Sequence, residues 1–340
     1  MTLPGAPEAA PAAARTPWWC VACGSIGTAD LIQNVALFLP FGFALASAGM
    51  RKGAAVALIV ALTFGVELLQ ASVIVGRDAS LGDVLANTAG GVLGWIAATR
   101  RRQLLTPGRR GALAAVVAIG AAFAIVATMA TGLLQPALSL AEYTRARMAP
   151  TVAGRPRFGG EVLKFSVNGE TYADRDVPRS LPRGDIEAEV TLTWPGRSKG
   201  TATIARIDGL SGDAVLSIDQ RSTSIRVHAF SHASAWRLRT PMVDVPIPPG
   251  IVAGDTVAVR FNWQGTDVAL VATSSRGASR TAGRYHPSDG WMLLNPFTGG
   301  LAFDRRRTIW TVIWVLTWSA AFGWYLWRAL LSTSTALSEP

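Results

Sequence analysis

The chain has 340 residues, of which 50% are hydrophobic and only 16% are charged. A soluble domain usually carries about 25% charged residues, so the composition argues against a wholly soluble protein and indicates a membrane protein with a soluble part attached. The net charge of +10 does not indicate a nucleic-acid-binding protein, because many basic residues cluster at the ends of apolar runs, where they fix membrane topology.

Residues 1–29 are predicted to form a disordered N-terminus followed by a segment at the membrane surface. Residues 1–17 are rich in Ala and Pro, a composition that cannot bury enough apolar surface to fold. Trp18 and Trp19 then match the aromatic anchors that lie at the level of lipid headgroups.

Cys20 and Cys23 form a Cys-x-x-Cys pair, a spacing found in redox pairs and in half of many zinc sites. A structural zinc needs four ligands, and the sequence offers no second cysteine pair and no histidine nearby. We therefore interpret the two residues as small apolar side chains at the start of a membrane segment or as a local disulfide. The sequence also contains no dinucleotide, Walker or zinc-protease motif, so we predict no metal site and no cofactor.

Residues 30–134 are predicted to form a membrane domain of four helices, and a further apolar run at 308–331 is long enough to span a membrane, leaving a polar tail at 332–340. Apolar runs place the four helices of the membrane domain at about 30–48, 54–75, 81–98 and 111–134. In the third of these helices, Gly90 and Gly94 form a Gly-x-x-x-Gly spacing, which lets helix backbones approach closely in lipid. We therefore expect the third helix at the centre of the bundle.

The second helix carries a polar stripe. Thr63, Glu67 and Gln70 lie at i, i+4 and i+7, on one helical face. An ionised side chain at the centre of a membrane helix costs roughly 2.5–3.5 kcal/mol, so this stripe should face protein rather than lipid. The polar residues that recur at helical spacing in the first and third helices are Asp30, Asn34, Asp83 and Asn87.

Glu67, Arg77 and Asp83 are the candidate catalytic residues. Arg77 lies in the loop after the second helix and is close enough to the end of that helix to pair with either carboxylate. A carboxylate in an apolar setting can act as a general acid or base, and an arginine can hold a phosphate. The alternative interpretation is a network of interhelical hydrogen bonds and ion pairs that fixes the bundle. The remaining members of this membrane polar cluster are Asp30, Asn34, Gln70 and Asn87.

Basic loops set the predicted orientation. The loops at 51–52 and 100–110 carry seven basic residues and no acidic ones, so the positive-inside rule places them in the cytoplasm. The Arg77 loop and the region between the fourth helix and the final one are then extracytoplasmic, in a bacterial-type inner or cytoplasmic membrane. The three basic residues at 305–307 oppose this orientation, but short loops near the first helices usually dominate.

Residues 135–159 are predicted to be a linker, and the hydrophobic pattern changes to period two over 160–303. Short alternating runs separated by Asp-Gly and Gly-Asp turns favour an antiparallel β-sandwich. A region of about 140 residues can bury a core of its own. The predicted strands are 187–194, 202–207, 214–219, 224–230, 255–263 and 267–272.

The motif residues in the first three helices and their connecting loop are Asp30, Asn34, Phe38, Pro40, Gly42, Glu67-Leu-Leu-Gln70, Arg77, Asp83, Asn87, Gly90 and Gly94. In this order and spacing, residues 30–98 resemble the VanZ-like membrane family. The resemblance implies an integral membrane protein and a link to glycopeptide antibiotic resistance, with which the founding branch of that family is associated. It names no reaction.

Two stretches of the β region, 183–190 and 257–270, match the opening strand and a late hairpin of one fold. On these stretches, residues 160–303 resemble a concanavalin A-like, laminin-G-like jelly roll. The resemblance implies a glycan-binding domain, sometimes with calcium. The acidic residues that we interpret as plain turn residues rather than calcium ligands are Asp208, Asp213 and Asp219.

We therefore predict a multi-domain membrane protein, with an α-helical transmembrane bundle and an all-β jelly-roll sandwich inserted before a final transmembrane helix. The first functional hypothesis is an envelope protein whose sandwich binds a glycan, and the second is a membrane enzyme that acts on a lipid-linked substrate through Glu67, Arg77 and Asp83. A transporter is less favoured, because clear inverted repeats are absent. The expected partners are membrane lipid and a cell-surface glycan or lipid-linked precursor, not nucleic acid. The aromatic residues that either stack on sugar rings or fill the sandwich core are Trp194, Trp236, Trp263 and Trp291.

Overall fold

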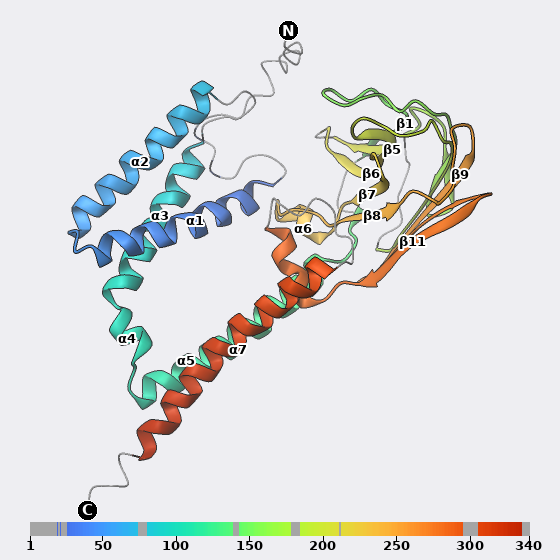
Figure 1. Ribbon diagram of the computed structural model, residues 1–340. Coiled ribbons are helices and arrows are strands. Elements are labelled where there is room, and N and C mark those ends of the chain that lie inside the picture. The colour runs from blue at the N-terminus through green and yellow to red at the C-terminus, as the bar shows by residue number, and fades with distance from the viewer. Residues whose placement is uncertain are drawn as a thin grey trace, which may run out of the picture. The chain divides into compact units, whose positions relative to one another are not determined.

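The protein consists of two compact units in a computed structural model (Figure 1). One unit spans Ala127–Val312 and contains the β-sheets, and the other contains the helices before it and the part of the chain from Ile313 onward. The structure describes residues 19, 21, 26–73, 80–138, 143–177, 184–210, 212–294 and 305–334.

The first three helices are α1 (Gly27–Ser47), α2 (Lys52–Val73) and α3 (Leu81–Thr99). Glycines allow α1 and α3 to pack backbone against backbone. A Cβ atom added at Gly42 would overlap the carbonyl oxygen of Gly91.

Two further glycines of α3 make the same kind of contact with α1. A Cβ atom at Gly90 would overlap the carbonyl oxygen of Val35, and one at Gly94 would overlap that of Leu39. On the α2 side, a Cβ atom at Gly91 would lie 2.6 Å from Ile59 Cδ1. Because α3 thus contacts both α1 and α2, the structure confirms its predicted place at the centre of the three helices.

Helix α3 is the most polar of the long helices in the membrane domain. Among the described residues, four helical segments are long and apolar enough to cross a membrane, and α3 is not one of them. Its polar residues and glycines lower its hydropathy, and its packing against α1 and α2 buries them. The segments that qualify are Gly27–Ser47, Lys52–Leu69, Arg109–Leu133 and Arg307–Leu331.

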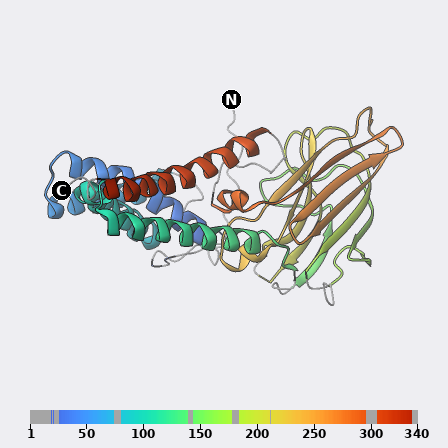
Figure 2. The same cartoon turned by 90° about the horizontal axis from the view of Figure 1, so that it is seen from below.

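The remaining helices are the short α4 (Arg101–Leu105), which the hydropathy pattern did not predict, and the long α5 (Arg109–Leu133) and α7 (Arg305–Ser334). Helices α5 and α7 lie side by side and antiparallel in both views (Figures 1 and 2). Phe123 of α5 packs on Trp314 and Trp318 of α7, with ring centroids 5.1 and 5.5 Å apart.

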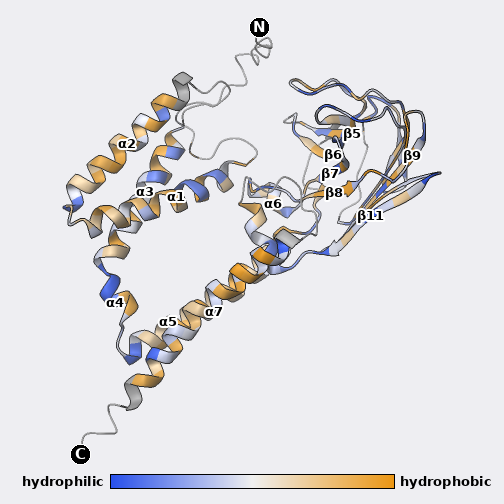
Figure 3. Cartoon of the chain, viewed as in Figure 1, coloured by the Kyte–Doolittle hydropathy of each residue, from blue (hydrophilic) through white to orange (hydrophobic). Residues whose placement is uncertain are grey.

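The end of α7 is also tied to α4. Trp324 Nε1 donates a hydrogen bond to the carbonyl oxygen of Leu105 at 3.0 Å, and the Tyr325 hydroxyl donates to that of Leu104 at 2.8 Å. Helices α2, α5 and α7 are largely hydrophobic (Figure 3), and many of their large apolar side chains are exposed. This is the surface expected of helices that face lipid.

Among the described residues of the β domain, eleven strands form two antiparallel sheets. The five-stranded sheet has the order β1 (Tyr143–Met148), β5 (Ala202–Gly209), β6 (Ala214–Gln220), β7 (Ser224–Ala229) and β8 (Met242–Pro246). The six-stranded sheet has the order β11 (Gly277–Arg284), β10 (Asp267–Ser274), β9 (Thr256–Gln264), β4 (Ile186–Thr193), β2 (Val162–Val167) and β3 (Glu170–Tyr172).

The core of the β domain is made from alternating apolar residues of both sheets. In β4 and β9 every second residue is buried, which is the pattern that predicted these strands. The largest fully buried side chains of the domain include Trp263, Phe165 and Phe261. The structure therefore confirms a β domain of two antiparallel sheets, whereas the jelly-roll connectivity stays a prediction.

Five of the strands were not predicted from the sequence, for two reasons. Strand β1 lies within residues 135–159, which were expected to be a linker, yet it pairs with β5. Strand β11 reads Gly-Ala-Ser-Arg-Thr-Ala-Gly-Arg, and such a strand has no apolar alternation to detect because none of its residues fills the core. The other strands that were missed are β2, β3 and β8.

The contact between α1 and α3 gives a test of the fold. We expect Gly90→Ala to destabilise the helical unit, because overpacking costs about 1–3 kcal/mol. Gly65→Ala on α2 is the control, since its Cβ would meet nothing within 4 Å and alanine favours a helix. Thermal unfolding of the full chain in detergent should give a lower midpoint for Gly90→Ala alone, and equal midpoints would contradict the packing.

Candidate functional site

A chain of hydrogen bonds links α1, α2 and α3. Asn34 on α1 donates from Nδ2 to Oδ1 of Asp83 on α3, at 2.5 Å. The backbone N–H of Asp83 donates to Ser80 Oγ at 3.3 Å, which makes Ser80 the N-cap of α3. The backbone N–H of Ser80 donates to Glu67 Oε2 on α2, at 3.0 Å. Two carboxylates and one amide from three helices are therefore joined at the N-terminus of α3.

The N-terminus of α3 also favours negative charge at this point. A helix N-terminus carries a partial positive charge because its first N–H groups lack partners within the helix. Asp83 lies in the first turn of α3, and the Glu67 carboxylate accepts a hydrogen bond from the residue that caps it. The local backbone thus supplies part of the stabilisation that two carboxylates need at this depth.

Two polar side chains that lie about one turn from the N-terminal end of α3, Thr63 on α2 and Asn87 on α3, are buried. Thr63 is 0% exposed and Asn87 is 4% exposed. Because Ile59 contacts Gly91 and Glu67 contacts Ser80, the antiparallel register of α2 and α3 brings Thr63 to the level of Asn87. Thr63 Oγ1 and Asn87 Oδ1 have no hydrogen-bond partner among the described residues.

The structure brings together part of the predicted cluster. Asn34 bonds directly to Asp83, and Glu67 joins them through Ser80. Asp30 lies in the first turn of α1, one turn before Asn34, and is half-buried. Arg77 and the side chain of Gln70 lie outside the described residues, as do Cys20 and Cys23.

Sequence reasoning missed the role of Ser80. The pair Ser80 and Asp83 has the Ser-x-x-Asp spacing of a helix cap before an apolar run, and that signal marks the start of α3. Chemically, the arrangement offers one buried and one half-buried carboxylate beside the N-terminus of α3, a setting for proton exchange or for binding a polar headgroup. In the part of the chain that the structure describes, no three His, Cys, Asp or Glu side chains gather as a metal site.

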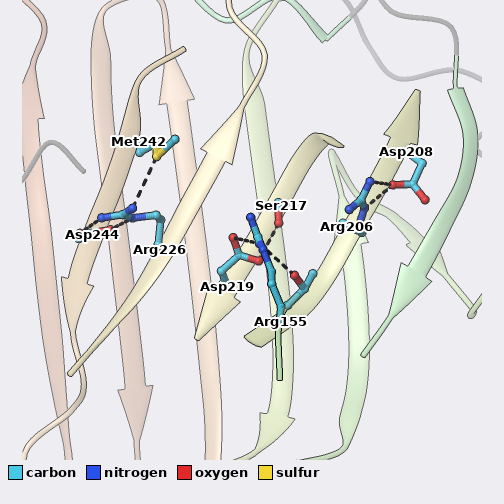
Figure 4. Close-up of polar contacts among 9 residues, drawn as sticks. Arg155, Arg206, Asp208, Ser217, Asp219, Arg226, Met242 and Asp244 are labelled. Carbon is cyan, nitrogen blue, oxygen red and sulfur yellow. Dashed lines mark hydrogen bonds and ion pairs between the residues drawn. The ribbon is translucent and has the colours of Figure 1, made fainter. Parts of the chain in front are cut away.

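The β domain holds a second group of polar residues, on the face of the five-stranded sheet that points away from the six-stranded sheet (Figure 4). Arg226 on β7 forms a two-point ion pair with Asp244 on β8, at 2.6 and 2.8 Å. Arg155 reaches Asp219 on β6 at 3.3 Å, and Ser217 Oγ donates to the same carboxylate at 2.9 Å.

This polar layer corrects part of one interpretation of the sequence. Asp208 and Asp219 lie near the ends of strands β5 and β6, as expected, but they are not plain turn residues, because each is only 6% exposed and each pairs with an arginine. Asp208 pairs with Arg206 and, at 3.5 Å, with Arg147 of β1. Arg147 and Arg155 are far in sequence from the acids with which they pair. Local turn patterns therefore could not predict these ion pairs.

His228 belongs to the same layer. It lies opposite Ser217 in the pairing of β7 with β6, and its Nε2 atom contacts Thr240 Oγ1. Burial of the imidazole lowers the pKa of His228 to about 4, although nearby Asp219 acts in the opposite direction. The imidazole is therefore neutral at pH 7.

The last part of the β domain contacts the first turns of α7. The last regular element of the domain is the 3-10 helix η3 (Pro287–Leu293). Its Asp289 is 0% exposed and forms a two-point ion pair with Arg307 of α7, at 2.9 and 2.6 Å. Ser288 hydrogen-bonds Thr311 at 3.2 Å, and Trp291 stacks on Trp310 at 4.6 Å.

The chain passes from the end of α5 directly into the core of the β domain. Leu134, the residue after α5, is fully buried in the core of the domain. The next residues are tied to the segment that begins α6 (His232–Ala235): His232 N donates to Gln135 O at 3.0 Å, and Ala137 N donates to Phe230 O at 3.1 Å. A Cβ atom at Gly290 of η3 would lie 2.7 Å from Ala130 Cβ of α5.

The four tryptophans considered for sugar stacking divide between core and surface. Trp194 and Trp263 are 2% and 1% exposed and belong to the core. Trp291 is stacked on Trp310. Trp236 alone of these four is largely exposed, at 60%.

Three described cavities border the β domain. The largest, of about 590 Å³, lies between the edge strands β8 and β11 and is lined by Thr223, Ser224, Asp244, Pro246, Arg280, Thr281 and Ala282. A second, of about 360 Å³, is lined by residues that include Trp194, Arg197 and Ile247. A third, of about 340 Å³, lies beside the last turns of α5.

Comparison with known proteins covers the helical part of the chain. A family model described as VanZ/LLP1 matches residues 8–106. The match includes α1, α2 and α3 with the polar cluster that they carry, and it supports the resemblance expected for residues 30–98. No curated protein and no solved structure matches the chain, so the likeness of the β domain to concanavalin A-like folds stays a prediction.

The buried histidine gives a pH test. The pKa of His228 is about 4 in the folded chain and about 6.5 when unfolded, so the unfolded state binds the proton more readily between these values. The free energy of unfolding of the β domain should therefore fall by about 2–3 kcal/mol as pH is lowered from about 7 to 4.5.

Circular dichroism of the full chain in detergent, recorded against temperature at both pH values, measures this loss. His228→Gln should remove most of the pH dependence, while His232→Gln, which alters an exposed side chain, should keep it. An unchanged pH dependence in His228→Gln would show that another group is responsible.

Proposed function

We propose that the protein is a VanZ-like integral membrane protein of the cell envelope, whose β domain lies on the extracytoplasmic side and binds an envelope glycan. One observation carries this proposal: the β domain is built onto two candidate membrane spans, by the buried Asp289–Arg307 pair at α7 and by Leu134 at the end of α5. A domain held in this way remains at the membrane surface, where envelope polymers are within reach.

The distribution of charge supports the proposed side of the membrane. The loop at 51–52 and the segment 100–110, which precede and follow membrane helices, are basic and contain no acid, as in cytoplasmic loops. The three basic residues at 305–307 oppose this orientation, and one of them, Arg307, forms an ion pair with Asp289.

The cavity between β8 and β11 is the candidate glycan site. Its volume of about 590 Å³ falls within the range of small-molecule sites. Hydroxyl groups of Thr223, Ser224 and Thr281 line it, together with the guanidinium of Arg280, which forms no ion pair with any described residue. Hydroxyls beside one unpaired cation suit a sugar that carries a carboxylate, because a guanidinium binds a carboxylate through two parallel hydrogen bonds.

Arg280 supplies the test of this site. We expect Arg280→Ala to weaken binding of the full chain to carboxylate-bearing peptidoglycan fragments by about tenfold or more, because a hydrogen bond to a charged group contributes about 1.5–3 kcal/mol. Arg260→Ala is the matched control, since Arg260 is an exposed arginine on β9 of the same sheet, pairs with Glu189 of β4 and does not line the cavity. Binding can be measured by calorimetry in detergent, and equal affinities for the three proteins would contradict the proposal.

A second candidate function is a membrane enzyme that acts on a lipid-linked envelope substrate. The observation that favours it is the partly buried chain of hydrogen bonds from Glu67 through Ser80 and Asp83 to Asn34. Carboxylates in such a setting can transfer protons, and the resemblance to the VanZ-like family connects the helical unit with glycopeptide antibiotics. The competing explanation is a network that only holds the helices together.

Glu67→Gln separates these two explanations. The amide oxygen of glutamine can still accept the hydrogen bond from Ser80 N–H, so the helical packing should persist, but the side chain can no longer exchange a proton. In a sensitive host that expresses the full chain at equal membrane levels, we expect Glu67→Gln to abolish protection against a lipoglycopeptide. Glu161→Gln, on an exposed glutamate of the β domain, should retain it. Protection that survives in Glu67→Gln would assign the cluster a structural role.

A further inference from the structure

The cavity beside α5 lies where a membrane helix meets the β domain. It has a volume of about 340 Å³ and is lined by Met129, Gly132, Leu133, Gln135, His232 and Trp236. The first three belong to the last turns of α5, and the other three belong to the segments that tie α5 to α6.

The cavity is at the level where the apolar span ends. Arg109–Leu133 is one of the candidate membrane spans, and Leu134 is already buried in the β-domain core. The cavity therefore borders both the last apolar turn of the span and the first polar surface beyond it. Trp236 is 60% exposed at this height, and tryptophan is enriched where lipid headgroups meet acyl chains.

The two halves of the cavity have different chemistry. Met129, which is 48% exposed, and Leu133 present apolar groups from the membrane side. Gln135 and His232 present hydrogen-bonding groups from the β-domain side. Apolar groups on the side of the candidate span and polar groups beyond its end match the upper acyl chain and the phosphate of a phospholipid.

We propose that this cavity holds one phospholipid of the surrounding membrane, with its upper acyl chain between Met129, Leu133 and the Trp236 ring, and its phosphate beside Gln135 and His232. This site is separate from the polar cluster of α1–α3 and from the cavity between β8 and β11. It requires only that α5 crosses a membrane, so it does not depend on glycan binding or on catalysis.

Gly132 allows a direct test. A Cβ atom at Gly132 would meet nothing within 4 Å, so a leucine side chain at this position extends into the cavity that Gly132 lines without a clash at its first atom. Gly120→Leu is the matched control, because Gly120 lies on the same helix and its Cβ would also meet nothing within 4 Å, yet it does not line the cavity. Both variants gain equally in helix propensity.

Native mass spectrometry of the full chain, released from detergent micelles that contain phosphatidylglycerol, measures the retained lipid. We expect wild type and Gly120→Leu to retain a lipid, and occupancy in Gly132→Leu to fall by about tenfold or more, a loss that corresponds to a tenfold rise in Kd. Trp236→Ala, which removes the exposed ring without adding bulk to α5, should also lower occupancy, and it provides the test if Gly132→Leu does not fold.

Two results would overturn the proposal. Equal occupancy in wild type and both cavity variants would show that the retained lipid lies elsewhere, and absence of retained lipid in wild type would leave only detergent in the cavity. A diacylglycerol with the same acyl chains tests the headgroup: we expect it to be retained less than phosphatidylglycerol. Equal retention of the two would contradict a phosphate contact at Gln135 and His232.

Discussion

The helical unit depends on one constraint: a polar group inside a membrane must find its partners within the protein. Helix α3 carries Asp83, Asn87 and four glycines, and its packing between α1 and α2 shields them from lipid. Glycine makes this possible, because Gly90 and Gly94 bring the backbone of α1 closer than any side chain would allow. The same close approach places Asn34 within 2.5 Å of Asp83. Tight packing and the polar cluster are thus one feature, and loss of the glycines would also separate the groups of the cluster.

In the β domain, the buried carboxylates are stabilised by ion pairs with arginine. Asp219, Asp208 and Asp244 lie on one face of the five-stranded sheet, and each has an arginine partner. Replacing a buried ion pair by apolar residues is often neutral or stabilising, so these pairs are weak evidence for stability. Removal of one partner leaves the other charge buried and unpaired, which is costly. Of these three pairs, only Arg226–Asp244 joins two neighbouring strands, β7 and β8, so it favours their observed pairing.

Elements with a strong apolar pattern could be predicted from the sequence, and elements defined by tertiary contacts could not. The long helices and the alternating strands β4 and β9 appear at the expected positions. Strand β11 has no apolar alternation to mark it, since none of its side chains fills the core. In the helical unit, residue types and spacing predicted the cluster, because polar side chains are costly in lipid. The bond between Ser80 and Glu67 depends on how α2 meets α3, and no local pattern contains that information.

The junction between η3 and α7 also has a consequence for biosynthesis. Helix α5 is made before the β domain, and its partner α7 is made after it, so the whole domain lies between two helices that pack together. The aromatic contacts of Phe123 and the ion pair of Asp289 must both wait for the last long segment of the chain to be synthesised. Closing so long a loop is slow compared with local folding. A chain truncated before α7 would thus leave both Phe123 on α5 and the carboxylate of Asp289 without their partners. Synthesis and packing of α7 are therefore the last steps of assembly.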